Sequence, residues 1–577
     1  MATRTLVGDI ETDGLLLDVS KFWVGVTYCI ETKETEVFYD ALKYVEHLQG
    51  ADLLVFHNGV GYDLPALEVL TGIYVTTPIV DTLILGKLAY YNVDKSFGFS
   101  LGKFGERLGF PKGEYSDWSG GYTKEMEVYC IQDVKVTTKL YTHLKRKTTW
   151  LPTSALHLEQ QLQQIVTEQY MKGFYFDVKR ARELHILLTH EKEVAEEALW
   201  QTFKPLYMCQ GPIKTPAKPF RRLGVSTVGP HQPIKLTTFN AGSGKHIVWW
   251  VTRLYGKQEW KRTDKGSAKT DAETLMEMFS EKEWAKPLLH YLEVTKILGQ
   301  LAEGPAAWLK LYNEKTHSIH GGIDILGTVS GRSSHSRPNL GQVPSVRAFK
   351  GEEARDLFTC PSDKVLVGCD LSGVELRCLA HYMYPYDGGR YANLILESDI
   401  HTANQEAAGL PTRDQAKTMI YCLVYGGGDG KLGSVVGKGA PEGKRLKDKF
   451  YKGTPGYKQL TEAVAKAAKK RWLKGITGRR LYVRSPHSAL NVLLQSLGSY
   501  ISKQWLVEAR RMAREAGIEY AQVSYVHDET TWEVNPEDAE KVSKILEESA
   551  VIAGEKLGVR MRIDAEAKTG RTWKEIH

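Results

Sequence analysis

The chain has 577 residues and a mass of 64.9 kDa, more than one hydrophobic core usually holds, so we expect roughly two to four domains. Its 42% hydrophobic and 25% charged residues are ordinary for a globular protein, and no apolar run approaches the roughly 18 residues of a membrane span. We therefore expect no membrane partner and a cytoplasmic location. Seven cysteines without a Cys-x-x-Cys pair argue against a disulfide framework and against a zinc site.

Three acidic segments occur in the first 150 residues. Residues 6–12 predict a short strand on which Asp9 and Glu11 point to the same face, and neighbouring carboxylates repel each other unless a cation lies between them. Asp63 follows an apolar strand at residues 53–56 and is expected at the start of a helix. Tyr129 and Asp133 lie one helical turn apart. Each segment alone is unspecific, but the three segments in this order are far more specific.

The middle of the chain carries fewer signals. Residues 159–170 predict the start of a long helical region. Residues 204–238 are rich in Pro, Lys and Arg, which predicts a basic loop or an inserted lobe. Its cations Lys214, Lys218, Arg221 and Arg222 are candidates for contacts with a nucleic-acid backbone.

A second pair of carboxylates is expected at strand ends in the C-terminal half. Residues 365–370 predict a buried strand that ends on Asp370, and residues 521–534 predict a hairpin with His527 and Asp528 at its tip. Such turns leave a carboxylate open to solvent. If one sheet brings Asp370 and Asp528 together, they form a second site for two metal ions.

Between these two segments, residues 413–426 predict a helix with a cationic and aromatic face. Arg413, Lys417, Tyr421 and Tyr425 recur every four residues, so they lie on nearly one side of the helix. Two cations followed by two flat rings suit the phosphates and the base of a nucleoside triphosphate. Residues 401–500 also hold 18 Lys and Arg against 6 Asp and Glu, which favours a phosphate-bearing partner.

The N-terminal acidic segments resemble the DEDDy family of proofreading 3′–5′ exonucleases. The matching residues are Asp9, Glu11, Asp63, Asp133 and Tyr129. The resemblance implies that the four carboxylates hold two divalent metals and that Tyr129 orients the attacking water.

The C-terminal segments resemble motifs A, B and C of family A (Pol I-like) DNA polymerases, around Asp370, Arg413 and Asp528. Residues 373–381 and 484–487 are most similar to the replicative polymerases of short-tailed bacteriophages. The resemblance implies two divalent ions, Mg²⁺ or Mn²⁺, held by Asp370 and Asp528. It further implies that Arg413, Lys417 and His401 grip the triphosphate, that Lys417 protonates pyrophosphate, that Tyr425 stacks near the templating base and that Glu375 excludes ribonucleotides.

Other residues match positions that contact DNA or the sugar in this family. Arg332, Asn339, Asn491, Gln495 and His527 are the expected contacts to primer–template DNA. Tyr421 stands where many family members have Phe, so its hydroxyl could replace a hydrogen bond that a dideoxynucleotide lacks. In the phage relatives a longer insertion at the position of residues 204–238 recruits host thioredoxin. The short segment here makes that partner doubtful.

The expected fold is a multidomain combination of α/β and α+β parts. An RNase H-like exonuclease domain at 1–150 precedes a right-hand polymerase, with the thumb and the start of the polymerase at 151–325, the palm at 326–398 and 485–577, and the fingers at 399–484. The expected function is template-dependent DNA synthesis from dNTPs with 3′–5′ proofreading, in a replicative role in the host-cell cytoplasm. A replisome helicase or primase is a further candidate partner.

Two alternatives remain at this point. A single-subunit RNA polymerase has a related palm and a related helix, but the exonuclease segments and Glu375 argue against it. A nucleic-acid-binding protein that has lost catalysis is the other, and it is disfavoured because every expected carboxylate is present.

Overall fold

A computed structural model of the chain describes residues 4–93, 95–118, 120–209, 211–215, 220–222, 225–227, 229–263, 266–397 and 400–577. Its contacts divide it into two compact units. The large unit comprises Met1–Phe176, Asn313–Gln342 and Phe358–His577, and the small unit comprises Asp177–Tyr312 and Val343–Leu357. Among the described helices, none combines the length and the apolar character needed to cross a membrane.

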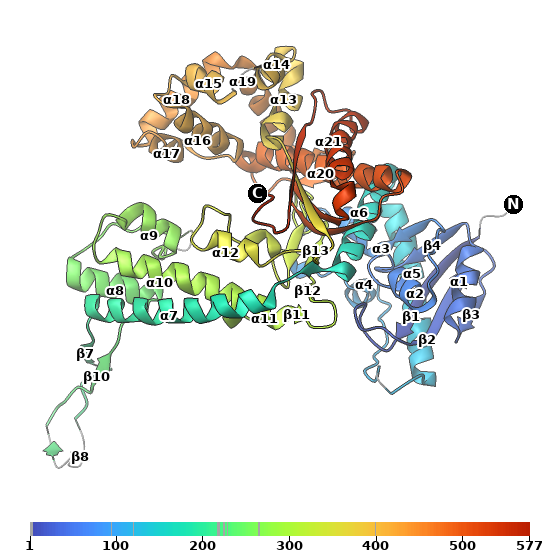
Figure 1. The fold of residues 1–577 in the computed structure, drawn as a ribbon, viewed down its shortest axis with the longest axis horizontal. Helices are drawn as coiled ribbons and strands as arrows, with labels where there is room; N and C mark the ends of the chain where they lie inside the picture. Colours follow the sequence, from blue (N-terminus) through green and yellow to red (C-terminus); the bar gives the residue numbers. More distant parts are fainter. Residues whose placement is uncertain are drawn as a thin grey trace. The chain divides into compact units, whose positions relative to one another are not determined.

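The large unit begins with a five-stranded mixed sheet in the order β3-β2-β1-β4-β5 (Figure 1). Strand β1 pairs antiparallel with β2 and parallel with β4, and its apolar residues Leu6 and Val7 are fully buried. The strands are β1 Thr5–Thr12, β2 Phe22–Cys29, β3 Thr35–Phe38, β4 Leu53–Phe56 and β5 Ile79–Asp81. The helices around them are α1 Ala41–Gln49, α2 Asp63–Thr71, α3 Thr82–Ala89, α4 Leu101–Arg107 and α5 Lys124–Lys147. This confirms the expected mixed α/β character of the N-terminal part.

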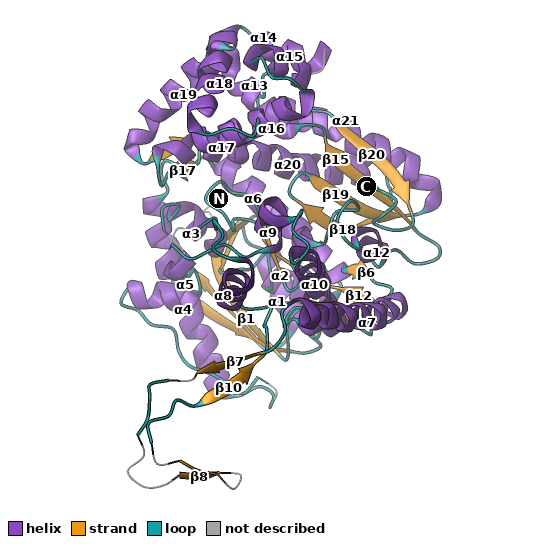
Figure 2. Ribbon diagram, turned by 90° about the vertical axis from the view of Figure 1, so that its left-hand side faces the viewer, coloured by secondary structure: helices purple, strands orange, loops and turns teal. Residues whose placement is uncertain are grey.

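A four-stranded antiparallel sheet in the order β18-β19-β15-β20 lies in the C-terminal part of the same unit (Figure 2). Its strands are β15 Val365–Leu371, β18 Tyr520–Val526, β19 Glu529–Val534 and β20 Ala565–Gly570. The Trp532 ring stacks on Tyr520 at 4.1 Å between centroids, as cross-strand aromatic neighbours do. Helices α20 Ala489–Glu515 and α21 Ala539–Lys556 pack on each other, where Trp505 Nε1 donates to the Leu546 carbonyl at 2.7 Å.

A series of helices connects β15 to α20 and shares one apolar core with the sheet. The helices are α13 Val374–Asp387, α14 Arg390–Glu397, α15 Ile400–Ala408, α16 Arg413–Val424, α17 Asp429–Ser434, α18 Ala440–Gly453 and α19 Pro455–Ala467, followed by the hairpin of β16 Trp472–Lys474 and β17 Arg480–Tyr482. Helix α16 begins at the expected residue, because the Thr412 side chain caps it by accepting from the Gln415 amide. It ends slightly early, since Gly426 adopts a φ of 74° and Tyr425 becomes the C-cap.

The small unit is mainly helical. Helices α7 Val178–Thr202 and α10 Ala285–Leu298 pack along each other, and α8 Gly244–Tyr255, α9 Ala272–Phe279, α11 Trp308–Leu311 and α12 Gly351–Asp356 complete it. Its core includes the rings of Phe203 and Phe239, stacked at 4.2 Å.

Within the expected basic loop at 204–238, which we call the arm, the described residues include short paired strands (Figure 1). Strand β7 Leu206–Cys209 pairs with β10 Ile234–Thr237, and β8 Phe220–Arg222 pairs with β9 Val225–Thr227. Lys214 is exposed, whereas Lys218 lies outside the described residues.

Helix α6 Thr153–Lys172 packs on α20 and β18, and it confirms the helix expected at 159–170. The short strands β6 Phe174–Tyr175 and β12 Ser318–Ile319 pair with each other, as do β13 Gly322–Asp324 and β14 Ser334–Ser336.

A fully buried ionic network joins α6 to α20. The two oxygens of Glu159 accept from Tyr500 Oη at 2.6 Å and from Lys503 Nζ at 2.7 Å. Lys503 also donates to the Ile325 carbonyl at 2.8 Å, and Arg479 donates to Tyr500 Oη at 3.1 Å. The network therefore holds Ile325, and with it the segment before Gly331, against helices α6 and α20.

We expect Glu159→Ala to destabilise the large unit. The change leaves the Lys503 ammonium and the Arg479 guanidinium buried without their carboxylate, which typically costs about 3–5 kcal/mol. A lower melting temperature in calorimetry checks this, and Glu159→Gln separates loss of charge from loss of volume. The matched control is Glu540→Ala, which breaks an exposed ion pair with Lys544. Equal melting temperatures for Glu159→Ala and wild type would contradict the expectation.

Candidate metal centres and the nucleotide-facing helix

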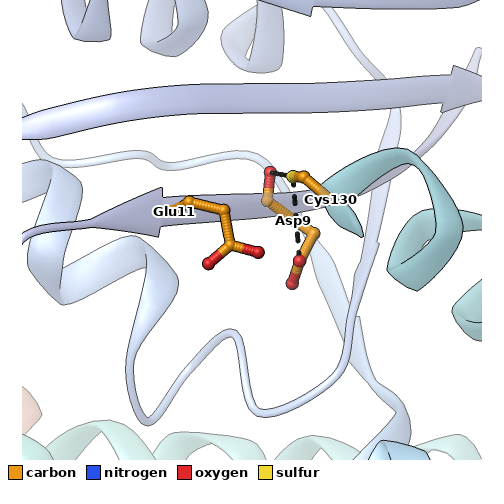
Figure 3. A group of neighbouring side chains, drawn as sticks. All are labelled: Asp9, Glu11 and Cys130. Carbon is orange, nitrogen blue, oxygen red and sulfur yellow. Dashed lines mark hydrogen bonds between the residues drawn. The ribbon is translucent and has the colours of Figure 1, made fainter. Parts of the chain in front are cut away.

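The first acidic cluster forms around strand β1. The strand's alternation places Asp9 and Glu11 on one face, and their carboxylate oxygens and the Cys130 sulfur all lie within 4.8 Å of one another (Figure 3). Asp63 begins helix α2, and its charge acts on Asp9 of β1. Asp133 comes from α5, one turn after Tyr129. The structure thus brings together the N-terminal acids that the sequence predicts.

Burial and mutual repulsion make this cluster costly without a cation. Glu11, Asp63 and Asp133 are 8%, 4% and 3% exposed. Desolvation, followed by the neighbouring charge of Glu11, raises the pKa of Asp9 well above its ordinary value. Desolvation likewise raises the pKa of Glu11 and of Asp133. A divalent ion bound among these carboxylates would offset their mutual repulsion and favour their charged form.

The donor set fits a hard divalent cation. Asp133 gives one oxygen, Oδ2, to Lys112 Nζ at 2.5 Å, whereas its buried Oδ1 has no hydrogen-bond partner among the described residues. A buried acceptor without a hydrogen-bond partner is available to a ligand such as a metal ion. Four carboxylates supply the oxygen ligands that Mg²⁺ and Mn²⁺ prefer.

Two residues of this cluster carry no sequence signal. Lys112 lies in the segment between α4 and α5, and its ammonium also stands 4.5 Å from the centre of the Tyr129 ring. Cys130 is fully buried, and its thiol donates to the Asp9 carbonyl at 3.6 Å and to Asp9 Oδ2 at 3.8 Å. Only the adjacency of Cys130 to Tyr129 could have indicated its place, and nothing in the spacing indicates Lys112.

The second acidic cluster lies at the edge of the C-terminal sheet. The Leu371 amide donates to the Asp528 carbonyl at 3.0 Å, and Asp370 pairs with Glu529 across β15 and β19. This register places Asp370 beside Asp528, as the sequence predicts. Glu529 accepts from Trp573 Nε1 at 2.9 Å and contacts His577 Nε2 at 2.7 Å, which holds its carboxylate against the C-terminal segment.

These acids also repel one another. Desolvation, with the charge of Asp528 next, raises the pKa of Asp370 to about 7, and desolvation with the charge of Glu375 raises that of Asp528 to about 6. Asp370 is nevertheless exposed. Solvent reaches its side chain, while the surrounding protein reduces its hydration. Two mutually repelling carboxylates that solvent can reach suit a divalent ion that also contacts a substrate.

Helix α16 presents its expected face. Arg413, Lys417 and Tyr425 are exposed and Tyr421 is partly buried, whereas the opposite residues of the helix enter the core. Tyr425 Oη donates to Glu375 Oε1 at 3.3 Å, and the Tyr421 and Tyr425 rings stack at 6.4 Å.

The two tyrosines lie nearest the acids. Desolvation, then the charges of Glu375 and Asp528, raise the pKa of Tyr421. The His401 ring lies 6.3 Å from the Tyr421 ring. Lys417 and Arg413 follow one and two turns further toward the start of the helix, so the structure brings the aromatic half of the face to the carboxylates.

The residues expected to contact DNA surround the same cluster. The guanidinium of Arg332 partly opposes the rise that desolvation and Glu375 cause in the pKa of Asp528, which places its charge near that carboxylate. His527 adopts a φ of 61° at the hairpin tip, and its ring lies 5.7 Å from His335. Asn491 and Gln495, one turn apart on α20, are both partly buried, and Asn491 Oδ1 has no hydrogen-bond partner among the described residues. Asn339 approaches Gly341 near Val526.

A cavity of about 1070 Å³ connects the first cluster with residues between β17 and the start of α20 in the same unit. Asp9, Lys112 and Asp133 line one part of it. Tyr482, the last residue of β17, and Arg484, which follows that strand, line another. Tyr90, Tyr91 and Phe99 add aromatic surface.

Comparison with known proteins identifies the family of this chain. The family model of DNA polymerase family A matches residues 229–575. The DNA-directed DNA polymerases of Enterobacteria phage T3 and Escherichia phage T7 are 33% and 32% identical, each over 99% of this chain and 100% of the relative. Those alignments extend over 707 and 713 residues, so these relatives carry segments that the 577-residue chain lacks.

A solved structure also shares the fold. The POL domain of Pol1 from M. smegmatis, in complex with DNA primer-template and dNTP, has a TM-score of 0.79 and 18% identity, covering 100% of this chain and 96% of that one. Since the family model matches more than half of the residues and two relatives exceed 30% identity along almost the whole length, this chain belongs to DNA polymerase family A.

Proposed function

We propose that this DNA polymerase performs two opposed phosphoryl transfers, one at each acidic cluster. Asp370 and Asp528 serve template-directed addition of dNTPs to a primer 3′ end. Asp9, Glu11, Asp63 and Asp133 serve 3′–5′ excision. The observation that carries the proposal is the presence of two carboxylate clusters on two different sheets, in each of which desolvation and neighbouring charges raise the pKa of the acids.

At the synthetic centre each residue has a role that suits its position. Two divalent ions, Mg²⁺ or Mn²⁺, supply activation of the primer 3′-hydroxyl and neutralise the leaving pyrophosphate when bound. Asp370 and Asp528 hold these ions. Arg413, Lys417 and His401 bind the triphosphate, and Lys417 gives a proton to pyrophosphate.

Selection of the nucleotide falls to the aromatic half of helix α16. Tyr425 stacks near the templating base. Glu375, held by the Tyr425 hydroxyl at 3.3 Å, crowds the 2′ position of the sugar and thereby disfavours ribonucleotides. This contact favours DNA synthesis over RNA synthesis as the activity of this centre.

At the excision centre the four carboxylates hold two divalent ions, which supply an activated water and stabilise the leaving oxygen when bound. Tyr129 orients that water. The cavity of about 1070 Å³ supports entry of a single-stranded primer end, because cations and aromatic rings line it together with Asp9 and Asp133.

Primer–template DNA is the proposed macromolecular partner. Arg332, Asn339, Asn491, Gln495 and His527 contact it near the synthetic centre, and the small unit acts as the thumb. Between residues 198 and 258 the chain has nine Lys and Arg and no Asp or Glu. We therefore assign the arm at 204–238 to the duplex backbone rather than to a thioredoxin-type partner.

The two activities should separate by mutation. Asp9→Ala removes a metal ligand of excision only, and Asp370→Ala removes one of synthesis only. Each loss should exceed the 10–100-fold effect that is typical when a residue merely orients a ligand. Extension and degradation of a labelled primer, with a matched or a mismatched 3′ end, measure both rates in each variant. Extension by Asp370→Ala, or slow extension of matched ends by Asp9→Ala, would refute the assignment.

Tyr421 should favour dideoxynucleotides. Its hydroxyl, close to Glu375 and Asp528, can replace a hydrogen bond that the missing 3′-hydroxyl of the nucleotide no longer makes. Tyr421→Phe should lower the ratio of dideoxy to deoxy incorporation by roughly 2- to 10-fold, the range of one net hydrogen bond of 0.5–1.5 kcal/mol. Competitive single-nucleotide incorporation measures this ratio, with Tyr451→Phe on α18 as control. Equal ratios in wild type and Tyr421→Phe reject the role.

A further inference from the structure

Lys112 is the cation that pairs with the first acidic cluster in the described part of the chain. Its Nζ lies 2.5 Å from Asp133 Oδ2, and the side chain is partly buried. A fixed positive charge beside the proposed metal ligands repels a metal ion. Its presence there therefore indicates a further task for the lysine.

The contacts of Lys112 indicate that task. Lys112 occupies one oxygen of Asp133, and the other, Oδ1, remains buried and without a partner among the described residues. The same ammonium stands over the Tyr129 ring at 4.5 Å, a cation–π distance. One side chain therefore fixes both the rotamer of Asp133 and the position of Tyr129, two of the residues that α5 contributes to the centre.

Lys112 also lines the cavity that contains Asp9 and Asp133. A phosphodiester that reaches these carboxylates passes close to its ammonium. Two physical roles are therefore open to the lysine: holding Asp133 and Tyr129 in place, or attracting the DNA backbone. The short, direct contacts with both α5 residues favour the first role, since they leave little freedom for the ammonium to follow a substrate.

We infer that Lys112 is a positioning residue of the excision centre, which directs Asp133 Oδ1 toward the metal and holds Tyr129 beside it. This inference rests on the proposed exonuclease function. It predicts that loss of Lys112 changes the metal affinity in the direction opposite to the one that charge alone would cause. Loss of a positive charge near a cation site strengthens cation binding by electrostatics alone, whereas loss of a positioning contact weakens it.

The test uses the full-length chain with Asp370→Ala, so that the synthetic centre does not contribute its metal site. Binding of Mn²⁺ is followed by the paramagnetic resonance signal of the free ion. Lys112→Met should weaken Mn²⁺ binding by about 10-fold or more, the typical effect of removing a residue that orients a metal ligand. Lys112→Arg should restore most of the affinity, because it can keep the ion pair and the ring contact.

The matched control is Lys124→Met. Lys124 carries the same charge at the start of α5 and pairs with Glu127, away from the acidic cluster, so its loss should leave Mn²⁺ binding unchanged. Mn²⁺ binding that is unchanged or tighter in Lys112→Met overturns the inference. If Lys112→Met lowers the melting temperature, Lys112→Gln replaces it and must meet the same criterion.

Excision kinetics in the otherwise wild-type chain add an independent readout. We expect Lys112→Met to lower kcat on single-stranded DNA by about 10–100-fold with little change in KM, and to leave primer extension intact. A rise in KM alone assigns Lys112 to DNA binding and overturns the inference. Absence of excision in the wild-type chain would instead refute the exonuclease proposal, and Mn²⁺ binding would still decide the role of Lys112.

Discussion

The repulsion between carboxylates that the backbone holds close together is the constraint on which the rest of this molecule depends. Asp9 and Glu11 cannot separate, because they belong to one face of a strand buried between two neighbours. Asp370 cannot leave Asp528, because a backbone hydrogen bond of 3.0 Å ties their segments. Folding therefore creates two places of concentrated negative charge, which divalent cations can neutralise and which phosphates can then approach.

The surrounding structure is arranged so that this repulsion is tolerated. At the first cluster, one lysine and one thiol occupy individual carboxylate oxygens from different sides. At the second, Trp573 and His577 hold Glu529, while Tyr425 holds Glu375. A separate buried network around Glu159 and Lys503 fixes the helices α6 and α20 in the same unit. The acids thus remain at fixed separations while their charges are left for metal ions.

Sequence patterns predicted the elements that carry the acids, because period-2 and period-3.6 placement follows directly from strand and helix geometry. Asp9 with Glu11, Tyr129 with Asp133, and the face of α16 all belong to this class. Lys112 and Cys130 were not predicted as members of the first cluster, because their places depend on how an irregular segment and a buried helix face pack against β1. The partners of Glu159 lie more than 300 residues away along the chain, and no local pattern encodes such pairing. The arm at 204–238 was expected as a loop, since its short strands lack a clear alternation of apolar residues.

The central claim is that each acidic cluster is a separate divalent-metal centre. Anomalous diffraction from crystals of the protein soaked in Mn²⁺ tests it most directly. The account predicts manganese peaks between Asp370 and Asp528 and, independently, within the group of Asp9, Glu11, Asp63 and Asp133. Crystals that bind manganese elsewhere but show no peak between Asp370 and Asp528 would contradict it.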